Sequence, residues 1–277
     1  MTPRRRTNDG SRRAGLQVDA ETRDAMLTVE RGMEVLRAFR SERMALSNAE
    51  LVRRTGLPKA TVSRLTSTFM QLDFLRHVPG GRQFEIGTGP LSIGTAFLEA
   101  SPMVQMATPF MQALADKLNV SVALAIGNRL EMLYIAYCTG RRIATLRLGV
   151  GSLLPMGVTA IGRAFLWALP PAEQKQRIAA LRRSAGAQGD AMERGIREGF
   201  AELDGGGTCF AVGGYQRDAY GIALPVRVGR ERIVMALSCG AVAVEPHLPA
   251  ARKRIVPELK KAAPLFEKLM ADVEGWP

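Results

Sequence analysis

Cysteine and histidine are scarce in this 277-residue chain. The three cysteines (Cys138, Cys209 and Cys239) are odd in number, lie far apart and form no CxxC pair, which argues against a disulfide framework and a zinc site. The two histidines, His77 and His247, belong to no HExxH motif. The sequence therefore predicts no metal site and no cofactor.

Long apolar stretches are missing as well. No run of about 18 apolar residues occurs, so we expect no membrane-spanning helix and no membrane partner. Ser11-Arg12-Arg13 resembles part of a twin-arginine export signal, but the charged stretch LQVDAETRD follows it instead of an apolar one. We therefore expect a protein without an export signal that acts in the cytoplasm.

The motifs of several enzyme classes are absent too. The chain has no GxSxG, no P-loop and no Rossmann GxGxxG, since Gly149-Val150-Gly151 continues with Ser-Leu-Leu. A nucleophilic pair of Cys209 or Cys239 with His247 remains an alternative, although the sequence shows no neighbour that would activate the thiol. We predict that the protein is not an enzyme.

Positive charge is what the chain has in excess. Its 38 Lys and Arg against 26 Asp and Glu give a net charge of +12 and a pI near 10.3, a balance that favours a polyanionic partner such as nucleic acid. Residues 1–24 are basic and small, with five arginines in the first thirteen positions and no apolar periodicity, so we expect a disordered arm. The arm is either a solvated tail or a source of salt-dependent affinity for phosphates.

Helical signals begin at Thr28, which can cap a first helix. Apolar residues then recur every three or four positions, the spacing of one buried helix face: Val29, Met33, Leu36 and Phe39. Ser47-Asn48-Ala49-Glu50 is typical of a capping box, in which Ser47 and Glu50 reciprocally satisfy backbone N–H groups. This box predicts a short second helix that runs to Thr55.

A sharp turn, a third helix and a hairpin follow. Gly56 supplies the left-handed conformation of the turn, and Pro58 begins a helix that runs to about Leu72. Phe74–Val78 and Arg82–Ile86 are strand-like and joined by a Pro-Gly-Gly turn. Three helices followed by a β-hairpin are the layout of a winged helix-turn-helix, which we assign to residues 25–87.

The third helix of such a domain enters the major groove of DNA, where residues near its N-terminus reach the base edges. Lys59 and Arg64 can neutralise phosphates or donate to guanine, while Thr61 and Ser63 can bond phosphates or bases. Arg82 on the hairpin can reach the flanking backbone or the minor groove. The predicted DNA-binding residues are Ser47, Pro58, Lys59, Thr61, Ser63, Arg64, Ser67 and Arg82.

The rest of the chain mixes helical and strand-like segments. Residues 88–102 form a predicted linker, with a helix over Leu91–Glu99 that Pro102 ends. Phe110–Leu118 has the spacing of an amphipathic helix. The strand-like segments are Val120–Ile126, Met132–Tyr137 and Ile143–Leu148, the first two joined by a turn at Gly127-Asn128-Arg129.

A glycine-containing loop precedes another predicted helix. Gly149 and Pro155 bracket the loop, and Thr159 caps a helix from Ala160 to about Ala168. A helix N-terminus beside such a loop offers free N–H groups to an anion, although an ordinary capped helix gives the same pattern. Tyr220, in a later aromatic and charged loop, either closes over a ligand or packs at the domain surface.

These motifs resemble the IclR family of bacterial transcriptional regulators. VERGMEVL (29–36) is similar to the family's opening helix, and LSNAEL (46–51) with TGLPKATVSRL (55–65) closely matches its helix-turn-helix. The likeness continues, in the family's order, through GVGSLLPM (149–156), TAIGRA (159–164), IALPV (222–226) and ALS (236–238). It covers nearly everything beyond the basic arm.

The resemblance implies an α+β protein in which an N-terminal winged helix-turn-helix is joined by a linker helix to a mixed α/β, GAF/profilin-like effector-binding domain (103–275). This domain would hold a curved antiparallel sheet and an effector pocket between the sheet and its covering helices and loops. The resemblance also implies a homodimer or a dimer of dimers on double-stranded operator DNA. With Tyr220 added from the loop, the candidate effector-binding residues are Met156, Thr159, Ala160, Ile161, Gly162, Tyr220, Gly221 and Ser238.

The sequence departs from the family pattern around this pocket. Gly157-Val158 stands where the family often has His-Ala, Arg163 where Lys is usual, and Gly221 where Cys or Ser is frequent. Cys239–Val242 replaces the common Val-Ser-Gly-Pro, and Phe210–Gly214 lacks an acidic residue often found there. Polar anchors for a small carboxylate are thus partly lost, which leaves open a larger, more apolar or absent ligand.

Together these features predict a DNA-binding transcriptional regulator controlled by a small organic effector, an aromatic or carboxylic acid of a catabolic pathway. The alternative is a DNA-binding architectural protein of low specificity, which the long C-terminal α/β segment argues against. The sequence does not distinguish a repressor from an activator, or a dimer from a tetramer.

Overall fold

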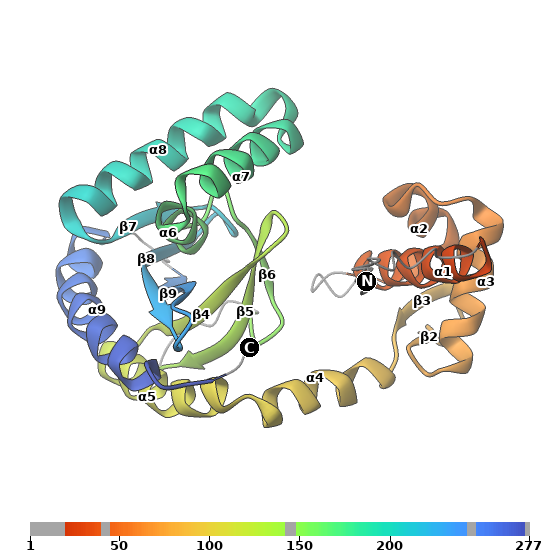
Figure 1. The fold of residues 1–277 in the computed structure, drawn as a ribbon, viewed down its shortest axis with the longest axis horizontal. Coiled ribbons are helices and arrows are strands. Elements are labelled where there is room, and N and C mark those ends of the chain that lie inside the picture. The colour runs from red at the N-terminus through yellow and green to blue at the C-terminus, as the bar shows by residue number, and fades with distance from the viewer. Residues whose placement is uncertain (1–19, 40–44, 142–147, 243–247, 275–277) are drawn as a thin grey trace, which may run out of the picture. The chain divides into compact units, whose positions relative to one another are not determined.

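The computed structural model describes residues 20–39, 45–141, 148–242 and 248–274, and the chain divides into two compact units between Pro90 and Leu91. In the first unit, helices surround a small antiparallel sheet in which β3 lies between β1 and β2 (Figure 1). Its elements are α1 (Ala20–Arg37), β1 (Leu46–Ser47), α2 (Asn48–Thr55), α3 (Lys59–Gln71), β2 (Leu75–His77) and β3 (Gln83–Ile86).

One apolar cluster holds the first unit together. It contains Val35 of α1, residues of α2 and α3, and residues of all three strands: Val35, Leu46, Leu51, Val62, Leu65, Leu75 and Phe84. Gly32 lets α1 approach α3, because a Cβ at this position would lie 3.1 Å from Cζ of Phe69. The cluster fixes the face of α3 that turns inward and therefore the face that is left outside.

The first helix differs from its prediction in both extent and orientation. α1 begins at Ala20, well before Thr28, and so takes in residues 20–24 of the segment expected to be disordered; residues 1–19 lie outside the described residues. Val29 and Met33, predicted to be buried, are 67% and 43% exposed, whereas Val35 is fully buried. The apolar periodicity predicted one face of α1. It did not show how much of that face the rest of the domain covers.

The helix-turn-helix and hairpin follow the sequence signals closely. α2 ends at Thr55 as predicted, Gly56 has a φ of 70°, and the Ser47 hydroxyl accepts a hydrogen bond from Glu50 N. The capping box is not reciprocal, because the Glu50 carboxylate binds Arg53 and Arg54 instead of the backbone of Ser47. No sequence signal predicted β1, a strand of two residues that leads directly into α2.

The second unit is built on a curved antiparallel sheet with the strand order β6-β5-β4-β9-β8-β7. Its strands are β4 (Ser121–Asn128), β5 (Glu131–Thr139), β6 (Leu153–Pro155), β7 (Cys209–Val212), β8 (Ala219–Val228) and β9 (Ile233–Val242). The sheet and the helix-turn-helix confirm the predicted α+β fold.

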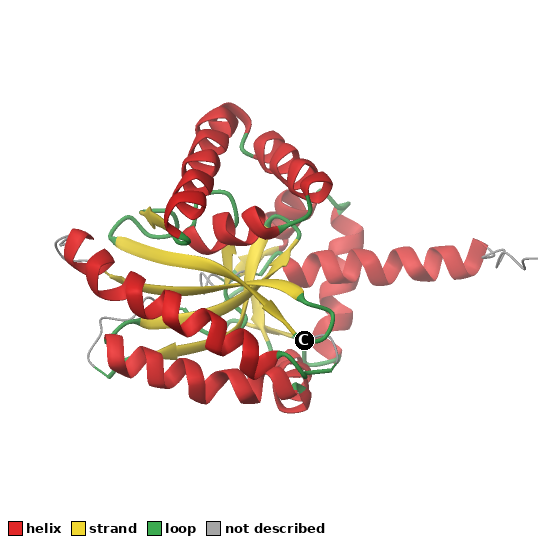
Figure 2. Ribbon diagram, turned by 60° about the vertical axis from the view of Figure 1, so that its left-hand side comes forward, coloured by secondary structure: helices red, strands yellow, loops and turns green. Residues whose placement is uncertain are grey.

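Helices cover both faces of this sheet (Figure 2). α5 (Pro102–Leu118) and α9 (Leu248–Met270) pack on one face, while α6 (Ala160–Ala168) packs on the other, with α7 (Pro171–Ser184) and α8 (Gly189–Gly206) beyond it. A short 3-10 turn (Gly186–Gln188) joins α7 to α8, and α4 (Gly89–Ala100) spans the boundary between the two units. Two separate apolar clusters result, one on each face.

Several predicted boundaries in this unit were wrong. Pro102 does not end the linker helix but is the first residue of α5, where the missing N–H of proline costs nothing and Ser101 caps the helix. Asn128 is still in β4, and the turn consists of Arg129, with a φ of 55°, and Leu130. The end of the glycine loop forms the edge strand β6. The predicted strand Ile143–Leu148 falls largely on residues 142–147, outside the described residues.

Two absences hold for the described residues. No helix among them combines the length and apolar character that crossing a bilayer requires. No three of their His, Cys, Asp and Glu side chains gather as a set of metal ligands would.

Candidate nucleic-acid interface and ligand cavity

The outer face of α3 is polar and basic in its N-terminal half. Pro58, Lys59 and Arg64 are exposed, whereas Val62 and Leu65 on the inner side are buried in the core. Thr61 and Ser63 are half-buried, and Ser67 is exposed one turn further along. The structure thus brings the predicted α3 residues together on one accessible surface.

Three cations on α3 and the β2–β3 hairpin differ from the neighbouring arginines of α2 in their ionic contacts. Among the described residues no carboxylate forms an ion pair with Lys59, Arg64 or Arg82, whereas the neighbouring Arg53 and Arg54 both pair with the carboxylate of Glu50. A cation without a carboxylate partner keeps its full attraction for phosphate or for guanine acceptors.

Three of the four predicted hydroxyl groups are already engaged within the domain. The Ser63 hydroxyl accepts a 2.6 Å hydrogen bond from Nδ2 of Asn48, the Ser67 hydroxyl donates to the Ser63 carbonyl, and Ser47 caps α2. Asn48 was missed as a positioning residue, although it lies inside the recognised capping motif. It links α2 to α3 and so fixes the angle at which α3 is presented.

The hairpin forms a small, ordered wing. Arg76 and Glu85 pair across β2 and β3 with a 2.9 Å ion pair, and the His77 and Phe84 rings stack at 4.8 Å. Gly80 has a φ of 74° at the tip, next to the exposed Arg82. Arg82 lies in the bend directly before β3, so the paired strands place it near the tip of the wing.

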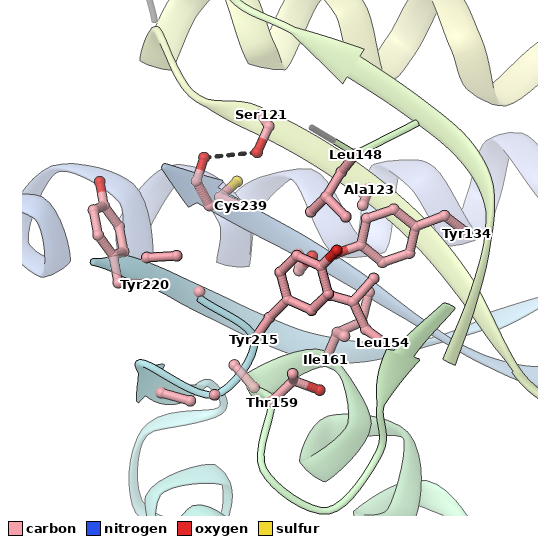
Figure 3. Close-up of a pocket in the computed structure, with 17 residues that line it drawn as sticks. Ser121, Ala123, Tyr134, Leu148, Leu154, Thr159, Ile161, Tyr215, Tyr220 and Cys239 are labelled. Atoms are coloured by element: carbon pink, nitrogen blue, oxygen red, sulfur yellow. Dashed lines mark hydrogen bonds between the residues drawn. The ribbon is translucent and has the colours of Figure 1, made fainter. Parts of the chain in front are cut away.

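The second unit contains a cavity between the N-terminus of α6 and the sheet (Figure 3). Its volume is about 50 Å³. Six of the eight predicted effector residues line it: Thr159, Ala160, Ile161, Tyr220, Gly221 and Ser238. Met156 and Gly162 do not. Met156 is fully buried, and Gly162 packs so tightly on the Met156 backbone that a Cβ would overlap it.

The floor of the cavity consists of small side chains on three adjacent strands. Ser121 pairs with Gly240, which pairs in turn with Gly221, and the next row on this face pairs Ala123 with Ser238. With so little projecting from the backbone, the floor is nearly flat. The Ser121 hydroxyl in the first row donates a 2.7 Å hydrogen bond to the Gly240 carbonyl. Ser238 supplies the hydroxyl group of the second row.

The N-terminus of α6 forms the opposite wall. Thr159 caps it as predicted, since its hydroxyl accepts from Gly162 N and donates to the Pro155 carbonyl. Ala160 and Ile161 precede the first intrahelical donor, so their N–H groups and the helix dipole point toward the cavity end. This wall favours an acceptor or an anionic group on a ligand.

A β-bulge in β5 adds a pair of tyrosines beside the cavity. Leu124 pairs with Ala136 but Ala125 pairs with Tyr134, so Ile135 is an extra residue. Strict alternation would place Tyr134 and Tyr137 on opposite faces, yet their rings stack at 5.8 Å on the α6 side. Spacing alone gave no signal for this bulge, and neither tyrosine was predicted as a site residue.

The two tyrosines are neutral phenols. Burial raises the pKa of Tyr134 far above its ordinary value, with a further increase from Tyr137, while the Ser238 hydroxyl acts in the opposite direction. Burial also raises the pKa of Tyr137, while the Ser121 hydroxyl acts in the opposite direction. The Tyr134 phenol therefore remains a hydrogen-bond donor at physiological pH.

The tyrosine that closes the cavity from the β7–β8 loop is Tyr215 and not Tyr220. Tyr215 points into the cavity toward Tyr134, whereas Tyr220 lies at the far end, in β8, and packs on Phe210 (Figure 3). Tyr215 is 40% exposed and Tyr220 only 9%. Sequence reasoning identified the aromatic loop and Tyr220, which lines the cavity, but it missed Tyr215 because the start of β8 could not be located.

The thiols offer no nucleophile. Burial raises the pKa of both Cys209 and Cys239 to about 12, and the Cys209 thiol donates to the Ala160 carbonyl. A thiol that stays protonated near neutral pH is a poor nucleophile. His247, the suggested base, lies outside the described residues.

Comparison with known proteins agrees with this geometry. The IclR helix-turn-helix domain matches residues 28–79, and the C-terminal domain of bacterial IclR transcriptional regulators matches residues 95–265. The HTH-type transcriptional regulator TsaQ1/TsaQ2 of Comamonas testosteroni is 32% identical over 199 residues, which is 71% of each chain.

Solved structures give the same result for the fold. An IclR family transcriptional regulator from Brucella abortus superposes with a TM-score of 0.78 at 31% identity, covering 91% of this chain and 95% of its own. An IclR homolog from Microbacterium hydrocarbonoxydans, solved in complex with 4-hydroxybenzoate, has a TM-score of 0.59 at 19% identity, covering 88% and 98%.

Proposed function

Because the chain belongs to the IclR family of bacterial transcriptional regulators, we propose that it binds operator DNA as a dimer under the control of a small organic effector. In this proposal α3 enters the major groove, the wing contacts the flanking backbone, and the effector occupies the cavity between α6 and the sheet. The effector is an aromatic or carboxylic metabolite of a catabolic pathway.

The observation that carries the DNA-binding part is a set of cations on α3 and the wing that form no ion pair with any carboxylate of the described residues. Lys59 and Arg64 flank the half-buried Thr61 and Ser63 on the exposed half of α3, and Arg82 projects from the wing. In a dimer, two such helices occupy successive major-groove half-sites roughly 34 Å apart. Lys59 and Arg64 then reach bases or phosphates, and Arg82 binds the flanking backbone.

Exposed apolar side chains on two helices support a dimer. On α1, Met26, Val29 and Met33 are 60%, 67% and 43% exposed. α4 has no buried residue in the described chain, although Leu91 and Ile93 are large and apolar and are 70% and 60% exposed. A second copy of the chain would cover such surfaces, which isolated soluble domains rarely leave open.

The cavity supports control by a small molecule. It joins a flat floor, buried hydroxyls and the N-terminus of α6, a combination of apolar walls and a few polar groups that is typical of ligand sites. The related protein from Microbacterium hydrocarbonoxydans holds 4-hydroxybenzoate. Effector binding would act on the winged domains through α4, with a coupling of about 1–3 kcal/mol.

The proposal is tested by fluorescence anisotropy on an operator that the full-length protein selects from a random DNA pool. The Lys59→Ala/Arg64→Ala variant should bind at least ten-fold more weakly, since each good base contact contributes about 1–3 kcal/mol. The matched control removes two exposed cations from the second unit, Lys175→Ala/Arg194→Ala, and should change affinity less than two-fold.

Two outcomes would contradict the proposal. Equal losses in both variants would show that only net charge matters. Equal affinity of the wild type for the selected operator and for unrelated DNA, lost alike in high salt, would support the architectural alternative.

A further inference from the structure

The cavity is too small for an aromatic ring while Tyr215 is in place. Its volume is about 50 Å³, whereas an apolar protein cavity that binds benzene has about 150 Å³. The Tyr215 ring points into this space from the loop between β7 and β8 (Figure 3). A ligand ring therefore needs space that the Tyr215 ring now occupies.

The phenol of Tyr215 lies next to that of Tyr134. The two side chains point toward each other in Figure 3, and the phenol of Tyr215 is near enough to contribute to the raised pKa of Tyr134. Tyr134 is 6% exposed, so its hydroxyl meets protein or ligand groups and not bulk water. The inner end of the cavity is thus already adapted to a ring that carries a hydroxyl group.

The loop holds Tyr215 at this point but allows its ring to leave. Gly213 has a φ of 69°, and Gly214 sits so close to the Val158 carbonyl that a Cβ would overlap it, which seats the loop against the segment that leads into α6. Tyr215 itself is 40% exposed. Because the residue lies partly in solvent and not in an apolar core cluster, its side chain can rotate outward without disturbing the core.

The remaining walls suit a flat molecule with polar groups at both ends. Ala123 and Gly221 give the floor no projecting side chains, and the N–H groups at the start of α6 lie across the cavity. The described lining contains no Asp, Glu, His, Lys or Arg. Near Tyr134 and Ser238 an uncharged hydroxyl is therefore satisfied better than a second charge.

We propose that Tyr215 is a placeholder for the effector, which is a hydroxylated aromatic molecule that displaces the Tyr215 ring and takes its place beside Tyr134. This inference rests on the proposed function, since it names the ligand class of the same cavity. Tyr134 selects the ring hydroxyl, the flat floor selects a planar ring, and the α6 N-terminus receives an acceptor group at the opposite end.

The test is calorimetric titration of the full-length protein with three probes that share a carboxylate: 4-hydroxybenzoate, benzoate and cyclohexanecarboxylate. The wild type should bind them in that order of decreasing affinity. Tyr215→Ala should bind 4-hydroxybenzoate several-fold more tightly, because an internal competitor has been removed. Tyr134→Phe should lower the affinity for 4-hydroxybenzoate about ten-fold and leave that for benzoate unchanged. Trp167→Phe, which changes an exposed aromatic side chain outside the cavity lining, is the matched control and should alter neither ratio.

Each contrary result overturns the inference. Weaker binding by Tyr215→Ala would make Tyr215 a wall of the site and not a placeholder. Equal binding of cyclohexanecarboxylate and 4-hydroxybenzoate, or no binding of any probe by wild type and Tyr215→Ala, would exclude the phenolic class. None of these results affects the operator-binding assay with the Lys59 and Arg64 variants, so the proposed regulatory function is judged separately.

Discussion

The side-chain amide of Asn48 donates a 2.6 Å hydrogen bond to the hydroxyl of Ser63 and thereby joins the first residue of α2 to the middle of α3. The Asn48 Oδ1 atom is buried and has no hydrogen-bond partner within the described residues. Helix α3 is thus held in place by a polar link in addition to its buried Val62 and Leu65.

This link predicts an unequal pair of mutational effects. Ser63→Ala leaves the Asn48 amide without its acceptor and should reduce the free energy of unfolding by about 1–3 kcal/mol. Asn48→Ala removes donor and unpaired acceptor together and should cost less. The double variant should resemble Asn48→Ala in urea unfolding followed by circular dichroism. Additive losses from the two single variants would mean that the side chains act independently.

Arg82 and Arg64 should differ in the kind of DNA affinity that they provide. Arg82→Ala removes the proposed contact to the DNA phosphate backbone. The slope of log K for DNA binding against log salt concentration should therefore fall in magnitude by about one unit, while the preference for the operator stays the same. Arg64→Ala should reduce the preference for the operator over unrelated DNA. Anisotropy titrations between about 50 and 200 mM salt measure both quantities. A loss of preference in Arg82→Ala with an unchanged slope would reverse the assigned roles.

Gly162 should be intolerant of any side chain. A Cβ there would overlap the backbone of Met156, so Gly162→Ala must push α6 away from the turn before it and should cost about 1–3 kcal/mol or more. Gly205→Ala, in α8 with no atom within 4 Å of the added Cβ, is the matched control. Its stability should be unchanged or slightly higher, because alanine favours helix over glycine. Similar melting temperatures for the two variants would be evidence against the tight α6 turn.

The buried thiols predict a loss of stability at alkaline pH. Burial raises the pKa of Cys239 from 9.0 to about 12, so the folded state holds this proton more tightly than the unfolded state. The contribution is fully present below about pH 9 and is lost as the pH rises from there toward 12. Cys239→Ala should therefore show a shallower fall in the free energy of unfolding above about pH 9. Rapid reaction of Cys239 with a thiol reagent in the native protein at neutral pH would contradict this burial.

Local signals made the helix-turn-helix predictable from the sequence. The Ser47 cap, Gly56 and Pro58 each determine the backbone within a few residues. Ser47 and Gly56 have the predicted roles, and Pro58 directly precedes α3 instead of being its first residue. β1 was not predictable because its two residues become a strand only by pairing with β3. The covered part of α1 was misjudged for a similar reason, since the predicted stripe included the exposed Val29 and left out the buried Val35, and tertiary neighbours decide which of the two is covered.

The cavity was only partly predictable. Motif position located Thr159 and Ser238, and both line the cavity. Tyr134 depends on a bulge at Ile135 that reverses the side-chain alternation, and a single sequence does not reveal where a strand gains an extra residue. Tyr215 depends on the path of a loop that is seated by its contact with Val158, which is distant in sequence.

Dimethyl sulfate footprinting on the selected operator tests the central claim most directly, because this reagent methylates guanine N7 in the major groove, the atom that Arg64 and Lys59 are proposed to approach. The account predicts two clusters of protected guanines about one helical turn apart with the wild type, and loss of that protection with Lys59→Ala/Arg64→Ala at concentrations that still saturate the DNA. Guanines that stay fully reactive under bound wild-type protein, or protection that persists in the double variant, would contradict it.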